Sequence, residues 1–455
     1  MRFVRKFEKA PAVERLEGRT LLSGVPLGVS EVAFAGGVQL RLLGTAGNDR
    51  ITVTHTAAGL VVGNTGGWTE TFTKTYDSLW IGTGAGNDSL VVDPSVHLSA
   101  TLMGGNGNDT LVSGSGNDSL YAGGTGKKML VAGSGNDVLV SLGATAATLV
   151  GGAGHDSFWA DNNSAEKVTK VTSAETRSGS VHRVNGFYNM GSSVAASRPG
   201  AMAKTLAVHK VSEPAVEQGV SYASFSNDPL FASSGPTEAD VKQGNVGDCF
   251  YLAVLSSVAK IDPWRLRESI VDLGDGTYAV QFVKNGHDVF VRVDSQLATW
   301  SGGYVTYAGL GNQNSLWVAL MEKAFCYVRT NSASYSSIDS GWMDEAYTLL
   351  GAAPSSTYSF ADAGSLMSQI ESQLKAGKSV TYATATAPAG SALLDSHAYV
   401  VESVGFDSKG VPATLRLRNP WGIDGAGSDG NDDGYVTVTA AQAFKAFTGL
   451  VYATV

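Results

Sequence analysis

The chain has 455 residues, of which 43% are hydrophobic and 16% are charged, a composition that suits globular domains with ample cores. Its formal net charge is −9 and no long basic run occurs, which argues against nucleic acid as a partner. The two cysteines exclude a disulfide framework, and there is no run of eighteen or more apolar residues to predict a membrane span. Glycine is abundant, with 56 residues, and most of the excess falls before residue 160, which indicates repeats.

Residues 1–30 are expected to form a separate leader or targeting tail. Met1 to Lys9 are basic, but charged residues interrupt the stretch APAVERLEGRTLLSG that follows, so an ordinary signal peptide is not predicted. The string LEGRTLLSG resembles a short leader of some large bacterial extracellular and repeat proteins. The resemblance implies an extracellular or cell-surface location in a bacterium, and an unstructured polar tail is the alternative.

A unit of nine or ten residues recurs between Gly104 and Trp159. Gly and Asn allow the positive φ of tight turns, and the apolar residue two places after each Asp predicts a short, inward-facing strand. Stacked units predict an all-β parallel β-roll over residues 31–160, whose turn carbonyls and carboxylates suit Ca²⁺. The clear copies are GGNGNDTLV, SGSGNDSLY, AGSGNDVLV and GGAGHDSFW.

These units resemble the RTX-type nonapeptide repeats, which implies calcium binding at the aspartate of each copy. Lys127 and Lys128 stand where one copy should have Asn-Asp, and we expect them to block or replace one calcium site by charge. A roll held by its apolar ladder alone, without metal in its turns, is the alternative. The aspartates that match the ligand position of the family are Asp49, Asp88, Asp109, Asp118, Asp137 and Asp156.

Residues 161–220 are rich in Ser, Ala, Thr and Lys, which predicts a flexible linker open to proteolysis. After the linker, residues 243–258 read QGNVGDCFYLAVLSSV. Asp248 is a predicted N-cap, and Cys249 then lies in the first turn of an apolar helix. Unpaired N–H groups and the helix dipole favour a thiolate at such a position.

Two later stretches supply the groups that a nucleophilic thiolate needs. His397 lies in DSHAYVVESVGF and Asn419 in LRLRNPWG, so nucleophile, base and orienting amide follow one another as Cys, His and Asn. The other cysteine, Cys326, lies inside a helix predicted over residues 315–328 and is interpreted as structural. On that helix Glu322 and Lys323 are expected to be surface charges.

QGNVGDCFYL, LWVALMEKAF, SHAYVV and LRNPWG occur in this order and resemble the catalytic core of the calpain family of papain-like cysteine proteases. The resemblance covers residues 221–455 and implies an α+β fold of two lobes, a helical lobe (221–362) and a β-barrel lobe (363–455), with the active site between them. It implies that Gln243 and the Cys249 backbone N–H stabilise the oxyanion. It also places Gly341 and Trp421 on the substrate side of the cleft. Ser396, before the base, stands where calpains have Gly.

The same resemblance implies calcium ligands in the core, at Gly235 and Asp240 and at Asp432 and Asp433 of the loop GIDGAGSDGNDDGYV. This loop departs from the family because its second Trp is absent and Gly425 stands at the position of a Glu ligand. A turn cap at Asp240 and a solvated acidic loop are the alternatives. Whether calcium gates the core or only folds the repeats therefore stays open.

The sequence thus predicts a calcium-dependent or calcium-stabilised cysteine endopeptidase that acts on proteins or peptides. Two other classes remain. One is an adhesion or binding protein with an inactive protease-like domain, attached to a cell surface or matrix; the other is a Cys-dependent acyl transferase. The expected partners are protein substrates and calcium, with no nucleic acid and no membrane span.

Overall fold

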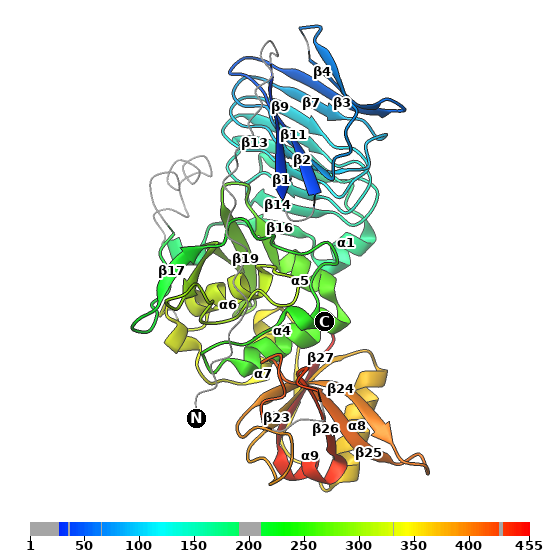
Figure 1. Ribbon diagram of the computed structural model, residues 1–455, viewed down its shortest axis with the longest axis vertical. Coiled ribbons are helices and arrows are strands. Elements are labelled where there is room, and N and C mark those ends of the chain that lie inside the picture. The colour runs from blue at the N-terminus through cyan, green and yellow to red at the C-terminus, as the bar shows by residue number, and fades with distance from the viewer. Residues whose placement is uncertain (1–26, 35–36, 65, 191–210, 331, 427–430) are drawn as a thin grey trace. The chain divides into compact units, whose positions relative to one another are not determined.

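The computed structural model describes residues 27–34, 37–64, 66–190, 211–330, 332–426 and 431–455 (Figure 1). The predicted leader, apart from its last four residues, lies outside the described residues. The chain divides into a first unit that ends at Gly186 and a second unit whose main part runs from Val211 to Val455. We describe each unit by itself.

The first unit is a parallel β-roll built of two eight-stranded sheets (Figure 1). From β6 to β16 successive strands alternate between the sheets, so one full coil takes two repeat units. The predicted inward residues stack in register, as Leu120 does on Leu102 and Leu130 on Leu111, and all four are fully buried. The apolar ladder forms a continuous core between the sheets, which confirms the predicted roll.

The strands β1 with β2 and β3 to β5 pair antiparallel at one end of the two sheets. The strands in chain order are β1 (Gly28–Phe34), β2 (Gly37–Leu43), β3 (Arg50–Thr56), β4 (Gly59–Asn64), β5 (Thr69–Phe72), β6 (Ser78–Gly82), β7 (Ser89–Val92), β8 (Ser99–Met103), β9 (Asp109–Val112), β10 (Ser119–Tyr121), β11 (Lys127–Val131), β12 (Val138–Val140), β13 (Ala146–Val150), β14 (Ser157–Asp161), β15 (Glu166–Thr169) and β16 (Val181–Val184).

The turn glycines are required by the close stacking of consecutive coils. Gly107 has a φ of 123°, and a Cβ atom added to it would lie 1.6 Å from the carbonyl oxygen of Gly86 in the preceding coil. A side chain would therefore collide with backbone and would also strain its own φ. This requirement explains the repeated glycines that the sequence shows.

Part of the stretch for which we expected a flexible linker is folded. Residues 161–184 complete the roll with β15, the helix α1 (Ser173–Ser178) and β16, and a short 3₁₀ helix η1 (Tyr188–Met190) follows. Residues 191–210 lie outside the described residues. A capping box formed by Thr172 and Glu175 explains why α1 begins where it does.

The second unit begins with a helical lobe around two buried helices. Residues Phe250 to Ala259 of α4 are all buried, and so is every residue of α6. The elements are β17 (Ser221–Ser224), η2 (Glu238–Asp240), α4 (Cys249–Ile261), α5 (Pro263–Ser269), β18 (Ile270–Asp272), β19 (Thr277–Lys284), β20 (His287–Asp294), β21 (Gln296–Thr299), α6 (Trp317–Val328), η3 (Tyr335–Ile338) and α7 (Met343–Leu349).

The expected β-barrel lobe is a six-stranded antiparallel sheet in the order β22-β27-β23-β24-β25-β26, with α8 and α9 packed against it. Its core is separate from that of the helical lobe. The elements are β22 (Ser355–Thr357), α8 (Ala363–Lys375), β23 (Ser379–Thr384), β24 (Ala398–Phe406), β25 (Pro412–Arg418), β26 (Tyr435–Thr439), α9 (Ala440–Ala446) and β27 (Phe447–Ala453).

Buried polar contacts join the two lobes through α4, which packs on β23 and β24. The Ser257 hydroxyl accepts the Val380 N–H at 3.1 Å. The Arg418 guanidinium donates to the Ser256 hydroxyl and to the Val241 carbonyl, both at 2.9 Å. These contacts fix the interior strands β23 and β25 against the second half of α4, the helix whose first residue is the predicted nucleophile.

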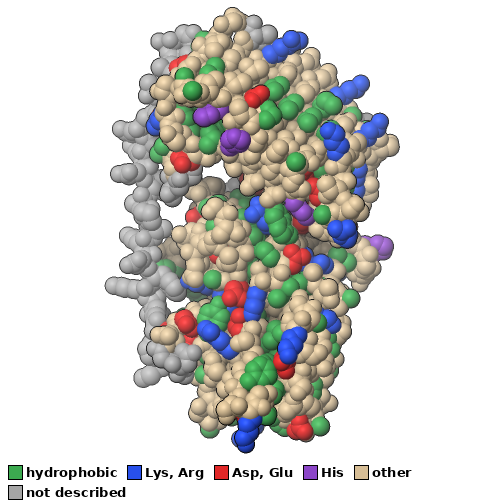
Figure 2. All heavy atoms as spheres, turned by 90° about the vertical axis from the view of Figure 1, so that its right-hand side faces the viewer, with side chains coloured by type: hydrophobic (Ala, Val, Ile, Leu, Met, Phe, Trp, Pro, Cys, Tyr) green, Lys and Arg blue, Asp and Glu red, His purple; other side chains and the backbone are tan. Residues whose placement is uncertain are grey.

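The surface drawn in Figure 2 carries Lys and Arg side chains interspersed with Asp and Glu. Mixed charge of this kind is ordinary for a globular protein. Within the described ranges, no helix combines the length and the apolar character needed to cross a membrane.

Candidate functional site

Cys249 is the first residue of α4 and is partly exposed. The predicted N-cap, Asp248, occupies the cap position, but its side chain makes no capping hydrogen bond. The Asp248 carboxylate is instead fully buried beside Glu322 in the interior. The helix therefore begins where the sequence predicted, but the capping hydrogen bond expected from the Asp248 side chain is absent.

His397 and Asn419 form a hydrogen-bonded pair in the sheet lobe. His397 Nε2 lies 2.8 Å from Asn419 Oδ1, and both residues are buried. An amide oxygen accepts hydrogen bonds, so Nε2 carries the proton and Nδ1 of the neutral ring is left as the base. The amide of Asn419 is fixed by its own donation to the Asp424 carbonyl at 3.2 Å.

An aromatic wall covers this pair. The ring of Trp421 lies 5.2 Å from that of His397, and Tyr399 lies 4.9 Å away on an edge-on contact. The Trp421 backbone N–H also donates to Asn419 Oδ1 at 3.0 Å. Trp421 thus stands over the imidazole–amide bond and also lines the cleft, on the side where the resemblance placed it.

One cleft of about 720 Å³ contains the predicted residues of both lobes. Gln243, Cys249, His397, Gly341 and Trp421 all line it, and Asn419 lies behind His397. Sequence reasoning missed two further residues of this wall, Trp342 and Thr384. The Thr384 hydroxyl donates to the His397 carbonyl and accepts the His397 backbone N–H, and no motif of the sequence analysis included Thr384.

Gln243 is held at the mouth of the helix by both its backbone and its side chain. Its backbone N–H donates to the Pro420 carbonyl at 2.8 Å, which ties the glutamine turn to the turn after Asn419. Its side-chain Nε2 donates to the Val246 carbonyl at 2.7 Å. One N–H of the amide is left, beside the first backbone N–H groups of α4, which have no partner within the helix.

Burial penalises a charge on either catalytic group taken singly. Burial raises the pKa of the Cys249 thiol to about 11. Burial lowers the pKa of His397 to about 4, opposed by the hydrogen bond to Asn419. The helix dipole led us to expect a resting thiolate, whereas burial opposes a charge on the thiol and on the imidazole alike.

Two charged side chains of α6 are buried, so our expectation that Glu322 and Lys323 are surface charges is wrong. Both Glu322 oxygens accept the Ala308 N–H, at 3.1 and 2.9 Å. Lys323 Nζ forms ion pairs with Glu213 at 2.6 Å and Asp294 at 2.7 Å. Burial raises the pKa of Glu322, and the charge of the neighbouring Asp248 raises it further.

Cys326 is fully buried in α6, in keeping with its interpretation as a structural residue. Ser396 has a φ of 49°, in the left-handed region that a glycine adopts without strain. Ser396 therefore keeps the backbone shape that its Gly counterpart in the resembled family would have, at a cost in strain.

Of the core residues expected to bind calcium, Asp240 does not fit a cation as it is placed. Its carboxylate is fully buried and accepts hydrogen bonds from Gln313 Nε2 and Trp317 Nε1, each at 3.1 Å, and from the Thr237 N–H at 2.9 Å. The Gly235 carbonyl also faces Gln313 Nε2, at 3.4 Å. Hydrogen-bond donors thus stand where a calcium ion would need oxygen ligands.

The acidic loop after Asn419 is described except for residues 427–430. Asp432 accepts the Asp424 N–H and Asp433 accepts the Tyr435 N–H, each at 3.0 Å. These bonds hold the loop to itself. Gly425, where the family has a Glu ligand, has a φ of 88°.

In the roll, the predicted aspartates are buried and form two columns, one on each sheet. Within a column, the backbone N–H of each aspartate donates to Oδ1 of the aspartate in the next coil, as Asp118 does to Asp137 at 2.7 Å. The first column is Asp49, Asp88 and Asp109, and the second is Asp118, Asp137 and Asp156, closed by Glu175.

The second column fits a bound cation. Among the described residues, Oδ2 of Asp118 and Oδ2 of Asp137 are buried and have no hydrogen-bond partner, as is also true of Asp88 in the first column. Burial raises the pKa of Asp118 to about 6 and that of Asp137 to about 8. A cation between coils would remove this cost and supply the missing partner.

Comparison with known proteins identifies both parts of the chain. The family model of the calpain family cysteine proteases matches residues 205–442 of the chain. The RTX calcium-binding nonapeptide repeat matches residues 100–125 and 141–164. The roll therefore carries repeats of a calcium-binding family.

Calpains of vertebrates are similar to this chain at about 30% identity. Calpain-8 of Mus musculus is 31% identical over 211 residues, which are 43% of this chain and 29% of the relative. The calpain-2 catalytic subunit of Gallus gallus is 30% identical over 210 residues, again 43% of this chain and 29% of the relative. The calpain-1 catalytic subunit of Sus scrofa is 30% identical over 235 residues, 46% of this chain and 31% of the relative.

The chain spans less than a third of the length of these relatives. The domain match nevertheless covers more than half of the chain and contains Gln243, Cys249, His397 and Asn419. The chain belongs to the calpain family of cysteine proteases and carries RTX repeats before its protease domain.

Proposed function

We propose that the second unit is a cysteine endopeptidase in which Cys249 is the nucleophile, His397 the base and Asn419 the orienting amide. The observation that supports this most is the His397–Asn419 bond of 2.8 Å in the same cleft as Cys249. That bond leaves a neutral Nδ1 for the cysteine thiol, which is the arrangement required for acyl transfer through a thioester.

Acylation begins when a peptide carbonyl approaches Cys249 Sγ. The thiol proton passes to His397 Nδ1 as the S–C bond forms, so the two charges arise together and the net charge of the cleft is unchanged. Their mutual attraction offsets the burial cost that each would have alone. This order of events agrees with a thiol pKa that burial raises and an imidazole pKa that burial lowers.

Gln243 and the backbone N–H of Cys249 stabilise the oxyanion of the tetrahedral intermediate. The C–N bond then breaks, the imidazolium gives its proton to the leaving amine, and the new N-terminus departs. Water attacks the thioester, with His397 taking a proton from it, and the thiol is restored as the acid product leaves. Trp421 keeps bulk water from the His397–Asn419 bond throughout.

We further propose that calcium acts on the roll. Asp118 and Asp137 would hold it through the buried oxygens that have no other partner, and the ion would neutralise adjacent carboxylates so that the coils can stack. The donors around Asp240 do not favour an equivalent role there. RTX repeats also suggest export to the outside of a bacterial cell, which fractionation and immunoblotting would test; a purely cytosolic pool would contradict it.

The experiment is casein cleavage by the full chain and by Cys249→Ala and His397→Ala variants, with Cys326→Ala as the thiol-matched control. We expect cleavage by the parent and the control, and none by the two cleft variants, whose circular dichroism should match the parent. Cleavage by Cys249→Ala would contradict the proposal.

The two alternative classes give other products. An acyl transferase would join an added primary amine to the substrate in preference to hydrolysing it, which mass spectrometry of the products would show. A binding protein with an inactive domain would leave casein intact in every variant.

A further inference from the structure

One coil of the roll departs from the repeat at the position of its aspartate. The strand register places Lys128 of β11 opposite Asp109 of β9, which in turn follows Asp88 in the same column. The next strand, β13, has Ala147 in register and so offers no carboxylate there. A basic residue therefore interrupts a column of acids.

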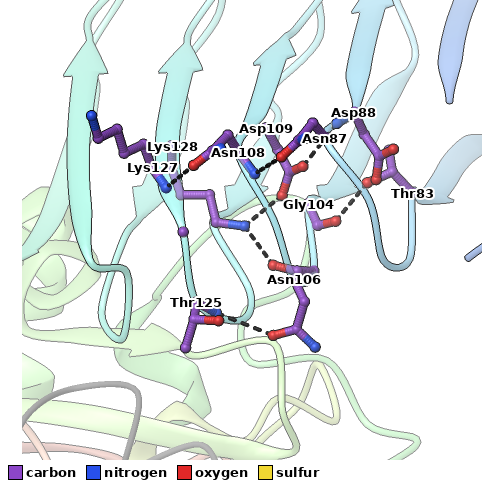
Figure 3. A network of polar contacts seen from close by, with 12 residues as sticks. Thr83, Asn87, Asp88, Gly104, Asn106, Asn108, Asp109, Thr125, Lys127 and Lys128 are labelled. Carbon is purple, nitrogen blue, oxygen red and sulfur yellow. Dashed lines mark hydrogen bonds and ion pairs between the residues drawn. The ribbon is translucent and has the colours of Figure 1, made fainter. Parts of the chain in front are cut away.

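Lys128 points into the roll and not to solvent (Figure 3). The side chains of Lys128 and Asp109 are both fully inaccessible and form an ion pair. The Lys128 ammonium also donates to the Gly105 carbonyl at 2.5 Å. The adjacent Lys127 is exposed, and its contact with this network is a backbone N–H bond to Asn108 at 2.8 Å (Figure 3).

The acceptors of Lys128 are of the kind that a calcium ion takes. Asp109 offers a carboxylate oxygen, and Gly105 offers a carbonyl from the glycine turn of the same coil. In the second column the matching oxygens of Asp118 and Asp137 have no partner among the described residues. Asp88 of the first column also keeps such an oxygen, so Asp109 differs from Asp88, Asp118 and Asp137 in that the chain supplies a cation, Lys128, to its Oδ2.

We propose that the Lys128 ammonium replaces one calcium ion of the roll, so that the turn at Asp109 carries its own cation and takes no metal. This inference rests on the proposed calcium role of the roll and adds which turn is exempt from it. A charge carried by the chain is present at any calcium concentration, whereas the stabilisation from a bound ion vanishes as free calcium falls below its Kd. The coils around β9 and β11 then stay neutralised when calcium is withdrawn.

The test uses the full chain with Cys249→Ala, to prevent self-cleavage, and two substitutions of the buried lysine. Lys128→Asp restores the aspartate of the repeat, and Lys128→Met keeps the length of the side chain without its charge. Lys127→Met is the matched control, because it removes the neighbouring charge from the surface. Calcium bound per chain is measured by titration calorimetry, and unfolding by circular dichroism in EGTA and in calcium.

We expect Lys128→Asp to bind one calcium ion more than the parent. We expect Lys128→Met to melt at a lower temperature than Lys127→Met in EGTA, because Asp109 is then buried without a counter-charge. If Lys128→Asp is unfolded in EGTA, its folding with the additional ion on calcium addition supports the proposal, and failure to fold overturns it.

An unchanged calcium count in a folded Lys128→Asp protein overturns the inference, as does equal melting of Lys128→Met and Lys127→Met in EGTA. Failure of the broader calcium role has a different signature. In that case the parent binds no calcium, while Lys128→Met still melts early in EGTA because the ion pair is lost.

Discussion

The roll and the protease domain both bury acidic side chains, but they neutralise them in different ways. In the roll, carboxylates recur at each coil, and Asp118 and Asp137 each keep a buried oxygen that accepts no hydrogen bond from the described residues. In the protease domain, Asp240 is surrounded by N–H donors, and Lys323 is shared between two acids. A periodic unit repeats its charges with its fold, so its unpartnered carboxylate oxygens recur at regular spacing and suit added cations. The unit without repeats places donors at individual acids such as Asp240 and Glu213, although the buried Asp248 and Asp424 keep oxygens without a hydrogen-bond partner among the described residues.

The comparison predicts that calcium removal loosens the roll and leaves the protease domain unchanged. In hydrogen exchange followed by mass spectrometry, peptides from β10 to β14 should lose protection in EGTA, whereas peptides from α4, α6 and β24 should not. At a calcium concentration 1,000-fold above Kd each ion is worth about 4 kcal/mol. Asp118→Asn with Asp137→Asn should remove the effect, and Asp93→Asn, outside both columns, should keep it. Equal loss of protection in α4 would contradict the comparison.

Removal of the buried Lys323 ammonium should destabilise the protease domain nearly as much as calcium removal destabilises the roll. Lys323→Met leaves Glu213 and Asp294 without their buried partner, which should cost about 3–5 kcal/mol of unfolding free energy. Lys375→Met is the matched control, because the Lys375–Glu371 pair lies at the surface and should be worth less than about 1 kcal/mol. Urea unfolding at pH 7 measures both, and added calcium should rescue neither.

The buried histidine His397 makes the protease domain sensitive to acid. The folded-state pKa of His397, about 4, lies below its ordinary value of 6.5, so the unfolded chain takes up the proton first as the pH falls. Stability is therefore unaffected above pH 6.5 and falls as the pH drops from 6.5 toward 4, by about 3 kcal/mol in all.

Urea unfolding across this range should show a weaker acid loss in His397→Gln than in the parent. His287→Gln, at an exposed histidine, serves as the control and should keep the parental slope. A slope equal in His397→Gln and the parent would show that the ring is not buried as described.

The smallest expected effect concerns backbone strain. In the described turns of the roll positive φ falls on glycines such as Gly107, with Lys170 as an exception, and the protease domain holds Ser396 at a φ of 49°. Ser396→Gly should relieve about 1 kcal/mol of strain, less the entropy that glycine adds to the unfolded chain. A change within a few tenths of a kcal/mol of zero, or a gain up to about 1 kcal/mol, fits this account. A loss of unfolding free energy greater than a few tenths of a kcal/mol, measured by thermal unfolding, would contradict it.

The roll and the parts of the cleft could be predicted because each leaves a local signal. The repeat period determines the register of the strands, and the short motifs around Cys249, His397 and Asn419 occur in a characteristic order. In each repeat the aspartate lies two residues before the inward apolar residue, so Leu130 identifies Lys128, and not Lys127, as the residue at the aspartate position. The alternation of buried and exposed residues in β11 agrees, because Lys128 and Leu130 are both buried. This step was open to sequence reasoning and was not taken.

Tertiary packing decided the features that the sequence did not reveal. Glu322 and Lys323 lie on a helix that is buried on all sides, so the assumption of one exposed face failed. Asp248 turned inward because a buried partner was present, which no capping rule can foresee. The protonation state of Cys249 depends on burial by the opposite lobe, whereas the helix dipole alone had suggested a thiolate.

The central claim is that Cys249 and His397 act as one unit, and labelling of Cys249 by an epoxide inhibitor of thiol proteases tests it most directly. Peptide mapping by mass spectrometry should find the label on Cys249 and not on the buried Cys326 of the parent, and neither should be labelled in His397→Ala. Equal labelling of Cys249 with and without His397, or no labelling of the folded parent, would contradict the account.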